Sequence, residues 1–131
     1  MPELLVVLLV IGILAAIAIA VLLDQSGKAK DAAAKAQVRN AQTAAETYAT
    51  DHGGEYKGLE IAVLKAAEPS LNDEGAARLI KVEAKGTGGF VVESEATDTR
   101  SKYAIERKEG GEVGRTCEAE NRAGCPAGGA W

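Results

Sequence analysis

Two cysteines are the residues of this 131-residue chain whose spacing most directly predicts chemistry. Cys117 and Cys125 flank seven residues of a polar, glycine-rich segment, and the chain has no other cysteine. The pair favours a disulfide, which would stabilise the fold by roughly 2–3 kcal/mol through loop closure. A metal site is the weaker alternative, because no further Cys or His lies nearby. Since disulfides persist outside the cytosol, this segment is expected there.

The remaining ionisable groups predict neither catalysis nor a cofactor. His52, the only histidine, lies beside Asp51 and near Glu55, and is best interpreted as a solvated turn residue rather than a metal ligand. Four acidic loop residues lack the dense ligand spacing of a calcium loop: Asp73, Glu74, Glu118 and Glu120. The sequence contains no Ser-His-Asp set, phosphate loop or Cys–His nucleophile. We therefore predict no catalytic residue, no metal and no cofactor.

Composition limits the possible partners and the size of the fold. The length allows one small domain with an appendage. The chain has 15 basic and 19 acidic residues, with a net charge of −4. A nucleic-acid-binding protein normally shows a strong excess of positive charge on one face, so no nucleic-acid partner is predicted.

Residues 4–23 form an apolar run without a charged or hydrogen-bonding side chain. As a helix the run would span roughly 30 Å, the thickness of the hydrocarbon core of a bilayer. A cleavable secretory signal is the weaker alternative, because the run is long and no basic region precedes it. Glu3, at the edge of the run, is either an interfacial helix cap or a carboxylate that requires a cationic partner. We expect a membrane anchor.

A single helix over residues 3–50 should position these groups, ended by Gly53 and Gly54. Beyond the apolar run, small residues recur at helical spacing and predict the face that packs on the rest of the fold: Ala29, Ala32, Ala33, Ala36, Ala41, Ala44, Ala45 and Tyr48. The opposite face is expected to be solvated: Lys28, Lys30, Lys35, Arg39 and Gln42. Residues 1–27 would then be the membrane or filament half, and residues 28–131 the head.

The second half of the chain predicts a small antiparallel sheet. A short helix over residues 59–67 is closed by Pro69, and Asn72 or Asp73 could cap another turn. Strands are expected at residues 79–84, 90–95 and 103–108, with a fourth at 113–117, because glycine-rich or polar turns separate them. In the first strand Ile80 and Val82 alternate with charged residues. Tyr48 and Phe90 should pack the helix on the sheet, so the predicted class is α+β.

Basic residues create a conflict over orientation. Lys28, Lys30 and Lys35 follow the apolar run, and the positive-inside rule would keep the head in the cytoplasm. The two cysteines favour a head outside the cytoplasm, because disulfides persist there. Removal of a basic leader peptide after insertion would resolve the conflict.

The N-terminal stretch resembles type IV pilins and type II secretion pseudopilins. The resemblance is carried by Glu3-Leu4-Leu5-Val6-Val7 and by Ile11-Gly12-Ile13-Leu14-Ala15-Ala16-Ile17-Ala18-Ile19. Residues 28–35 and 48–56 also look like bacterial pilins. The chain departs from the family pattern in two ways: its glutamate is third rather than fifth, and Ala20 stands where the family usually has proline.

The resemblance implies a pilin fold with a C-terminal disulfide loop and a role as the major subunit of a type IV pilus. Such a subunit is held in the bacterial inner membrane and then extracted by pilus assembly machinery into a helical surface filament, used for adhesion, twitching motility or DNA uptake. Glu3 matches the acidic position that pairs with the N-terminal amine of a neighbouring subunit, and Gly12 matches the family glycine. The implied assembly residues are Glu3, Leu4, Leu5, Leu8, Leu9, Gly12, Ile13, Ala16 and Ile17.

Two other functions remain open at this stage. A major pseudopilin would form short periplasmic filaments, and proteins of that kind often hold calcium in a C-terminal loop. A single-span membrane protein with a small binding domain would not assemble at all.

Overall fold

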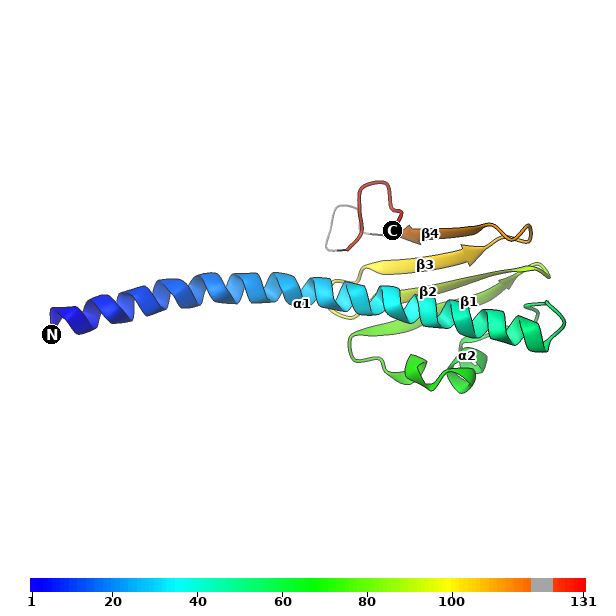
Figure 1. Cartoon of the computed structure of the whole chain (residues 1–131), viewed down its shortest axis with the longest axis horizontal. Helices are drawn as coiled ribbons and strands as arrows, with labels where there is room; N and C mark the ends of the chain where they lie inside the picture. The colour runs from blue at the N-terminus through cyan, green and yellow to red at the C-terminus, as the bar shows by residue number, and fades with distance from the viewer. Residues whose placement is uncertain (119–123) are drawn as a thin grey trace.

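One long helix and one antiparallel sheet make up the computed structural model, which describes residues 1–118 and 124–131. Helix α1 (Pro2–Asp51) runs the length of the molecule, and its second half lies across the sheet (Figure 1). The first half extends away from the head without a covering element. The predicted α+β class is confirmed, with a long helix, a four-stranded sheet and a C-terminal disulfide.

Both ends of α1 have a chemical cause in the sequence. Pro2 lies in the first turn, where a missing N–H breaks no helical bond, and Glu3 places a carboxylate near the positive end of the helix dipole. Gly53 and Gly54 follow the helix with φ of 70° and 88°, a region that favours glycine. The N–H of Gly54 donates to the carbonyl of Ala49 at 2.6 Å. The expected helix and its glycine stop are confirmed.

The buried face of α1 begins later and in a different phase than predicted. Ala29, Ala32 and Ala36 are exposed, so this part of the predicted stripe is wrong. Asp31 and Gln37 occupy core-facing positions instead, because hydrogen bonds satisfy both side chains. The apolar members of the face follow at spacings of three and four: Ala34, Val38, Ala41, Ala44, Ala45 and Ala49.

The sheet is a meander in the order β1-β2-β3-β4, with every neighbouring pair antiparallel. Its strands are β1 (Ala77–Lys85), β2 (Gly89–Ala96), β3 (Lys102–Arg107) and β4 (Val113–Cys117). The predicted strands are confirmed to within about two residues at most ends, and the fourth strand is present. Short turns join the strands, so β1 and β4 form the two edges.

An irregularity in β1 changes which of its side chains face the helix. Leu79 and Lys81 pair with consecutive residues of β2, which leaves Ile80 without a partner. The extra residue interrupts the alternation, so Leu79 and Val82 are both buried while Ile80 is only half-buried. The alternation of Ile80 and Val82 with charged residues therefore corresponds to burial at Val82 but not at Ile80.

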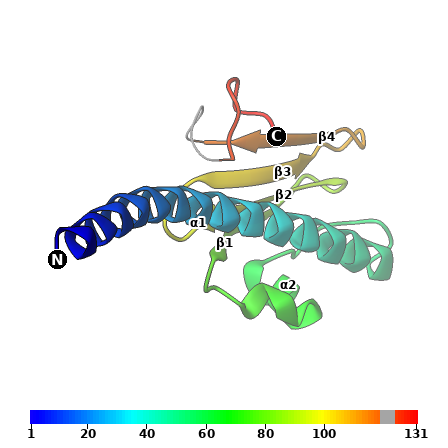
Figure 2. The same ribbon diagram turned by 60° about the vertical axis from the view of Figure 1, so that its left-hand side comes forward.

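The connection between α1 and the sheet contains α2 (Ile61–Ala67) and the 3₁₀ turn η1 (Pro69–Asn72). Figure 2 shows α2 beside α1, on the side of the sheet away from β4. Glu68 caps η1, because its Oε1 accepts the N–H of Ser70 at 3.2 Å. Of the two residues predicted to cap a turn before the sheet, Asp73 accepts the N–H of Gly75 through its Oδ1 at 3.1 Å. Asn72 has no such role: it lies at the end of η1 and donates to backbone carbonyls.

The core between α1 and the sheet is aromatic at both ends. Phe90 is fully buried and its ring centroid lies 4.7 Å from that of Tyr56. At the other end Tyr103 is fully buried and contacts Trp131 edge-on. Tyr48 packs only at the margin of the core, so the prediction that Phe90 joins helix to sheet is confirmed and that for Tyr48 holds in part.

Candidate functional site

The apolar first half of α1 is exposed along its whole length. Its fifteen large apolar side chains within residues 4–23 are each 48–69% exposed. The most apolar 18-residue stretch of α1 has no buried residue. A patch this large is far beyond the exposed apolar patches of ordinary monomers and marks an interaction surface. The helix is long and apolar enough to cross a membrane.

The predicted assembly residues lie on two neighbouring rows of this surface. One row is Leu5, Leu9, Ile13 and Ile17, and the other is Leu4, Leu8, Gly12 and Ala16. Both rows follow the four-residue spacing that forms ridges on a helix. The second row has only glycine and alanine in its second half, so small residues there lie beside a ridge of large side chains.

Glu3 and Gly12 are placed on the surface without constraint from their own chain. Glu3 is exposed in the first turn of α1, and no cation among residues 1–118 or 124–131 pairs with it. No atom of the described chain lies within 4 Å of the position that a Cβ on Gly12 would occupy. Both residues are therefore available to a neighbouring molecule.

A buried carboxylate fixes the place where α1 enters the head. Asp31 is fully buried on α1. Its Oδ1 accepts the hydroxyl of Thr99, and its Oδ2 accepts the hydroxyl of Tyr103 and, at 3.1 Å, the N–H of Gly124. These donors come from the β2–β3 turn, from β3 and from the disulfide loop. One side chain thus joins the helix to three segments that are distant in sequence.

The same contacts act on the phenol of Tyr103. Burial, and then the neighbouring Asp31 carboxylate, raise the pKa of Tyr103 well above its ordinary value of 10.0. The ionised form is disfavoured because it would be desolvated and would lie against a negative charge. Tyr103 therefore stays a hydrogen-bond donor to Asp31 throughout the neutral range.

We expect the head to lose stability in alkali through this tyrosine. In the unfolded chain Tyr103 ionises near pH 10, whereas in the folded chain it stays protonated, so the free energy of unfolding falls as the pH rises above about 10. Urea unfolding at pH values from 8 to about 11, compared with Tyr103→Phe, measures this contribution. Tyr103→Phe should be less stable than the native chain at pH 8, and its free energy of unfolding should fall less steeply as the pH rises. An equally steep fall in both proteins would show that Tyr103 is not the cause of the alkaline destabilisation.

The predicted disulfide is confirmed. Cys117 and Cys125 are bonded, with their Cα atoms 5.8 Å apart, and Cys125 is 2% exposed. Cys117 ends β4, and its backbone N–H donates to the carbonyl of Gly129 at 2.7 Å. Cys117 is therefore held to the C-terminal segment by a covalent bond to Cys125 and a backbone hydrogen bond to Gly129.

The predicted solvated face of α1 is partly wrong. Lys30 forms an ion pair with Asp98, and Lys35 and Arg39 lie over the ring of Trp131. Trp131 is half-buried and donates its Nε1–H to the carbonyl of Thr116 at 2.8 Å. The C-terminal residue covers this face, because its indole offers both a packing surface and a hydrogen bond.

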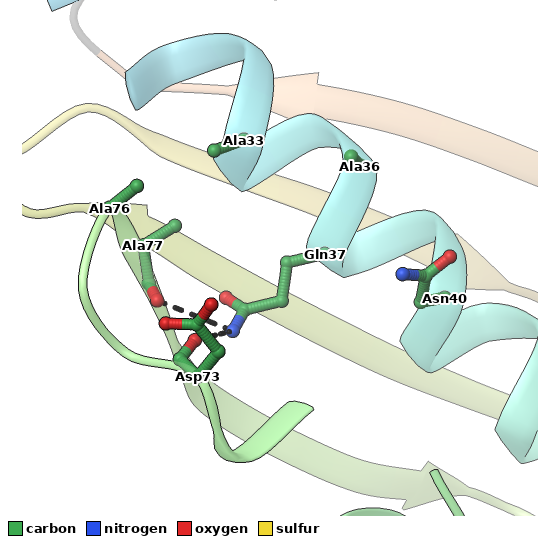
Figure 3. A pocket seen from close by; sticks show the side chains of 7 residues that line it. All are labelled: Ala33, Ala36, Gln37, Asn40, Asp73, Ala76 and Ala77. Carbon is green, nitrogen blue, oxygen red and sulfur yellow. Dashed lines mark hydrogen bonds between the residues drawn. The ribbon is translucent and has the colours of Figure 1, made fainter. Parts of the chain in front are cut away.

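A second buried polar side chain lies next to a small hollow between α1 and the start of β1. Figure 3 shows Gln37 reaching from α1 toward the sheet, where its Nε2 donates to the carbonyls of Asp73 and Ala77 at 3.4 and 3.3 Å. Its Oε1 accepts the hydroxyl of the buried Ser94. The hollow measures about 180 Å³ and is lined by Ala33, Ala36, Gln37, Asn40, Asp73, Ala76 and Ala77. Small side chains and satisfied polar groups give it no reactive centre.

The other candidate ligands are spread over the surface. His52 is exposed, stacks on Tyr48 at 3.9 Å, and its Nδ1 lies 2.8 Å from the carbonyl of Tyr48. Glu74 pairs with Lys65, whose hydrogen bond and charge lower the pKa of that carboxyl. Two of the other acidic loop residues have separate roles: Asp73 accepts from the N–H of Gly75, and Glu118 pairs with Lys102. Glu120 lies outside the described residues. Within the described ranges no three His, Cys, Asp or Glu residues converge.

The chain was compared with known proteins. No protein-family model, curated protein or solved structure matches it. The function must therefore be argued from the exposed apolar helix and from the head that it carries.

Two structural residues were missed by sequence reasoning. Asp31 is one polar residue in an alanine-rich segment, but its three-residue step to Ala34 places it on the buried face. The sequence alone does not decide whether Trp131 packs on the fold or is exposed. Its partners Lys35 and Arg39 are one helical turn apart, which could have indicated a shared contact.

Proposed function

We propose that this chain is the structural subunit, the major pilin, of a type IV pilus, and that it polymerises through the exposed apolar half of α1. The observation that carries the proposal is the contrast between the two halves of one helix. The second half is packed against a sheet, whereas fifteen large apolar side chains of the first half have no cover. The resemblance of residues 3–19 to pilins supports the same function.

Such a surface has two possible covers, lipid and other copies of the chain. In a bilayer the acyl chains cover it, and in an aqueous exterior each fully buried Leu or Ile favours association by roughly 1.5–3 kcal/mol. Copies packed side by side bury ridges of one helix in the grooves of the next. The rows that contain Leu9 and Gly12 offer both shapes. We propose the bacterial inner membrane as the location before assembly and the cell surface afterwards.

Glu3 adds specificity to this association. A carboxylate in an apolar filament centre is unfavourable unless a cation pairs with it. Pairing with an amine of a neighbouring copy would allow only those axial positions at which the two groups meet. Gly12 lets a neighbouring helix approach closely, because it has no side chain.

Electron microscopy after detergent removal tests the proposal. The purified full-length chain should form long threads with helical order as the detergent is diluted, and sheared cell surfaces should yield the same threads. Amorphous aggregates from a chain that is monomeric in detergent would contradict it and favour a non-assembling membrane protein. Short, calcium-dependent filaments in the periplasm would instead indicate that the chain is a pseudopilin.

A further inference from the structure

Three cations surround the indole of the C-terminal residue. The Cζ atoms of Arg39 and Arg115 each lie 5.2 Å from the centroid of the Trp131 ring, and the Nζ of Lys35 lies 5.8 Å from it. Lys35 and Arg39 come from α1, and Arg115 comes from the edge strand β4. We name Lys35, Arg39, Arg115 and Trp131 the basic patch.

The basic patch lacks acidic partners among the residues that the structure describes. Eight cationic side chains elsewhere in the described part form ion pairs with carboxylates. Within residues 1–118 and 124–131 no carboxylate pairs with Lys35, Arg39 or Arg115. The indole attracts cations, but it does not neutralise three of them. Three concentrated positive charges therefore favour an anionic partner from outside the chain.

Carboxylates without cationic partners gather at the other end of the head. Glu46 and Asp51 lie on the last turns of α1, Glu55 follows in the next turn, and Glu109 lies between β3 and β4. Figure 1 shows the end of α1 and the β3–β4 turn at the same end of the head, away from the apolar half. We name these four residues the distal acidic end. None of the four has an ion pair to a described cation.

A hollow of about 480 Å³ makes part of the distal acidic end accessible. Glu46 and Glu109 both line it, together with Thr50, Gly54 and Arg107. Arg107 and the exposed Lys57 are the described cations of this region that form no ion pair. Lys85 and Lys108 line a neighbouring hollow with Glu109, but each pairs with another carboxylate. Four unpaired carboxylates therefore face two unpaired cations, and the region is negative overall.

We infer that the basic patch of one copy binds the distal acidic end of a second copy. This inference rests on the proposed function and specifies a contact between heads that adds to the packing of the apolar helices. The two surfaces differ, so the contact is head-to-tail, which builds an open helical filament rather than a closed dimer. Charge complementarity sets the register, while the apolar surface supplies most of the affinity.

Positions along α1 give the axial shift that the contact requires. Arg39 precedes Glu46 by seven residues, and Lys35 precedes Asp51 by sixteen. At about 1.5 Å per residue, parallel neighbouring helices would be offset by roughly 10–24 Å. The apolar run of residues 4–23 is roughly 30 Å long, so about two thirds of it stays in contact at an offset of about 10 Å and about a fifth at about 24 Å.

Zero-length cross-linking tests the contact directly. A carbodiimide joins a lysine amine to a carboxylate that touches it, so mixed copies with normal and heavy nitrogen reveal links between molecules. We expect mixed-label peptides that join Lys35 to Glu46, Asp51 or Glu55, in filaments and in concentrated detergent solution. Mixed-label links that omit Lys35 would overturn the inference, even if filaments form. If links through Lys35 form between copies of a chain that builds no filaments, the contact between heads is supported and the proposed pilus function is refuted.

Charge exchange provides a second, independent test. Arg39→Glu with Arg115→Glu should raise the critical concentration for assembly about tenfold, and so should Glu46→Arg with Asp51→Arg. An equal mixture of the two double variants should assemble again, because each reversed surface then finds its complement. Lys65→Glu with Lys81→Glu makes the same change in net charge on α2 and β1, away from both surfaces, and should have little effect. Unchanged assembly of the first variant, or no recovery in the mixture, would overturn the inference.

Discussion

Arginine in place of Leu9 or Ile13 is expected to abolish filaments while the head stays folded. Leu9 is 63% exposed and Ile13 54% exposed, and both lie on the ridge of large side chains in the middle of the apolar run. A guanidinium at the centre of such a surface is unfavourable by roughly 2.5–3.5 kcal/mol, and the penalty recurs at every subunit of a filament. Electron microscopy after detergent removal measures the loss, and circular dichroism of the head checks its folding.

Matched variants separate charge from a general effect of substitution. Leu9→Met and Ile13→Leu keep an apolar side chain of similar volume and should assemble normally. Ala62→Arg adds the same guanidinium at an exposed position of α2 and should also assemble. The amount of each variant in the membrane fraction shows whether insertion is preserved. Normal fibres from either arginine variant in the apolar run would refute the packing of copies through α1.

The second large effect is expected at Asp31. Asp31→Ala removes the acceptor for the hydroxyls of Thr99 and Tyr103 and for the N–H of Gly124, all of which then lack a partner. Buried donors without partners should lower the free energy of unfolding by roughly 2–5 kcal/mol. For a head of this size, thermal unfolding should shift down by about 10 °C or more. Melting of the full-length chain in detergent measures the shift.

Asp98 is the natural control for this variant. It forms an ion pair with Lys30 near the same end of the head, but its side chain is 59% exposed. Asp98→Ala should therefore change the free energy of unfolding by less than about 1 kcal/mol. Asp31→Asn, which keeps one acceptor oxygen, should fall between the two. The fluorescence of Trp131 gives a local readout, because its ring contacts Tyr103, which donates to Asp31. Equal shifts for Asp31→Ala and Asp98→Ala would contradict the structural role of Asp31.

Sequence reasoning could predict the elements of the fold because each has a strong local signal. The apolar run and the glycines after Asp51 define α1, and glycine-rich turns separate strands of alternating residues. Two cysteines in one polar segment leave little choice of partner. These signals act over a few residues, so they do not depend on tertiary contacts.

The contacts between elements could not be predicted in the same way. The burial of Asp31 depends on donors 68 to 93 residues away, and the positions of Lys35 and Arg39 depend on the last residue of the chain. The half-buried Ile80 reflects the pairing of β1 with β2, not the alternation within β1. The apolar surface, in contrast, can be predicted from the sequence alone, because a run of twenty apolar residues indicates a membrane or interaction surface without any tertiary contact.

The uninterrupted course of α1 through residues 24–30 also determines how the head is turned about the axis of the anchor. With about 3.6 residues per turn, one residue inserted there would swing the head by about 100° and move it by only about 1.5 Å. An insertion of seven residues would nearly restore the original azimuth while lengthening the shaft by roughly 10 Å. Length and angular orientation of the head are thus coupled through the number of residues in one rigid rod.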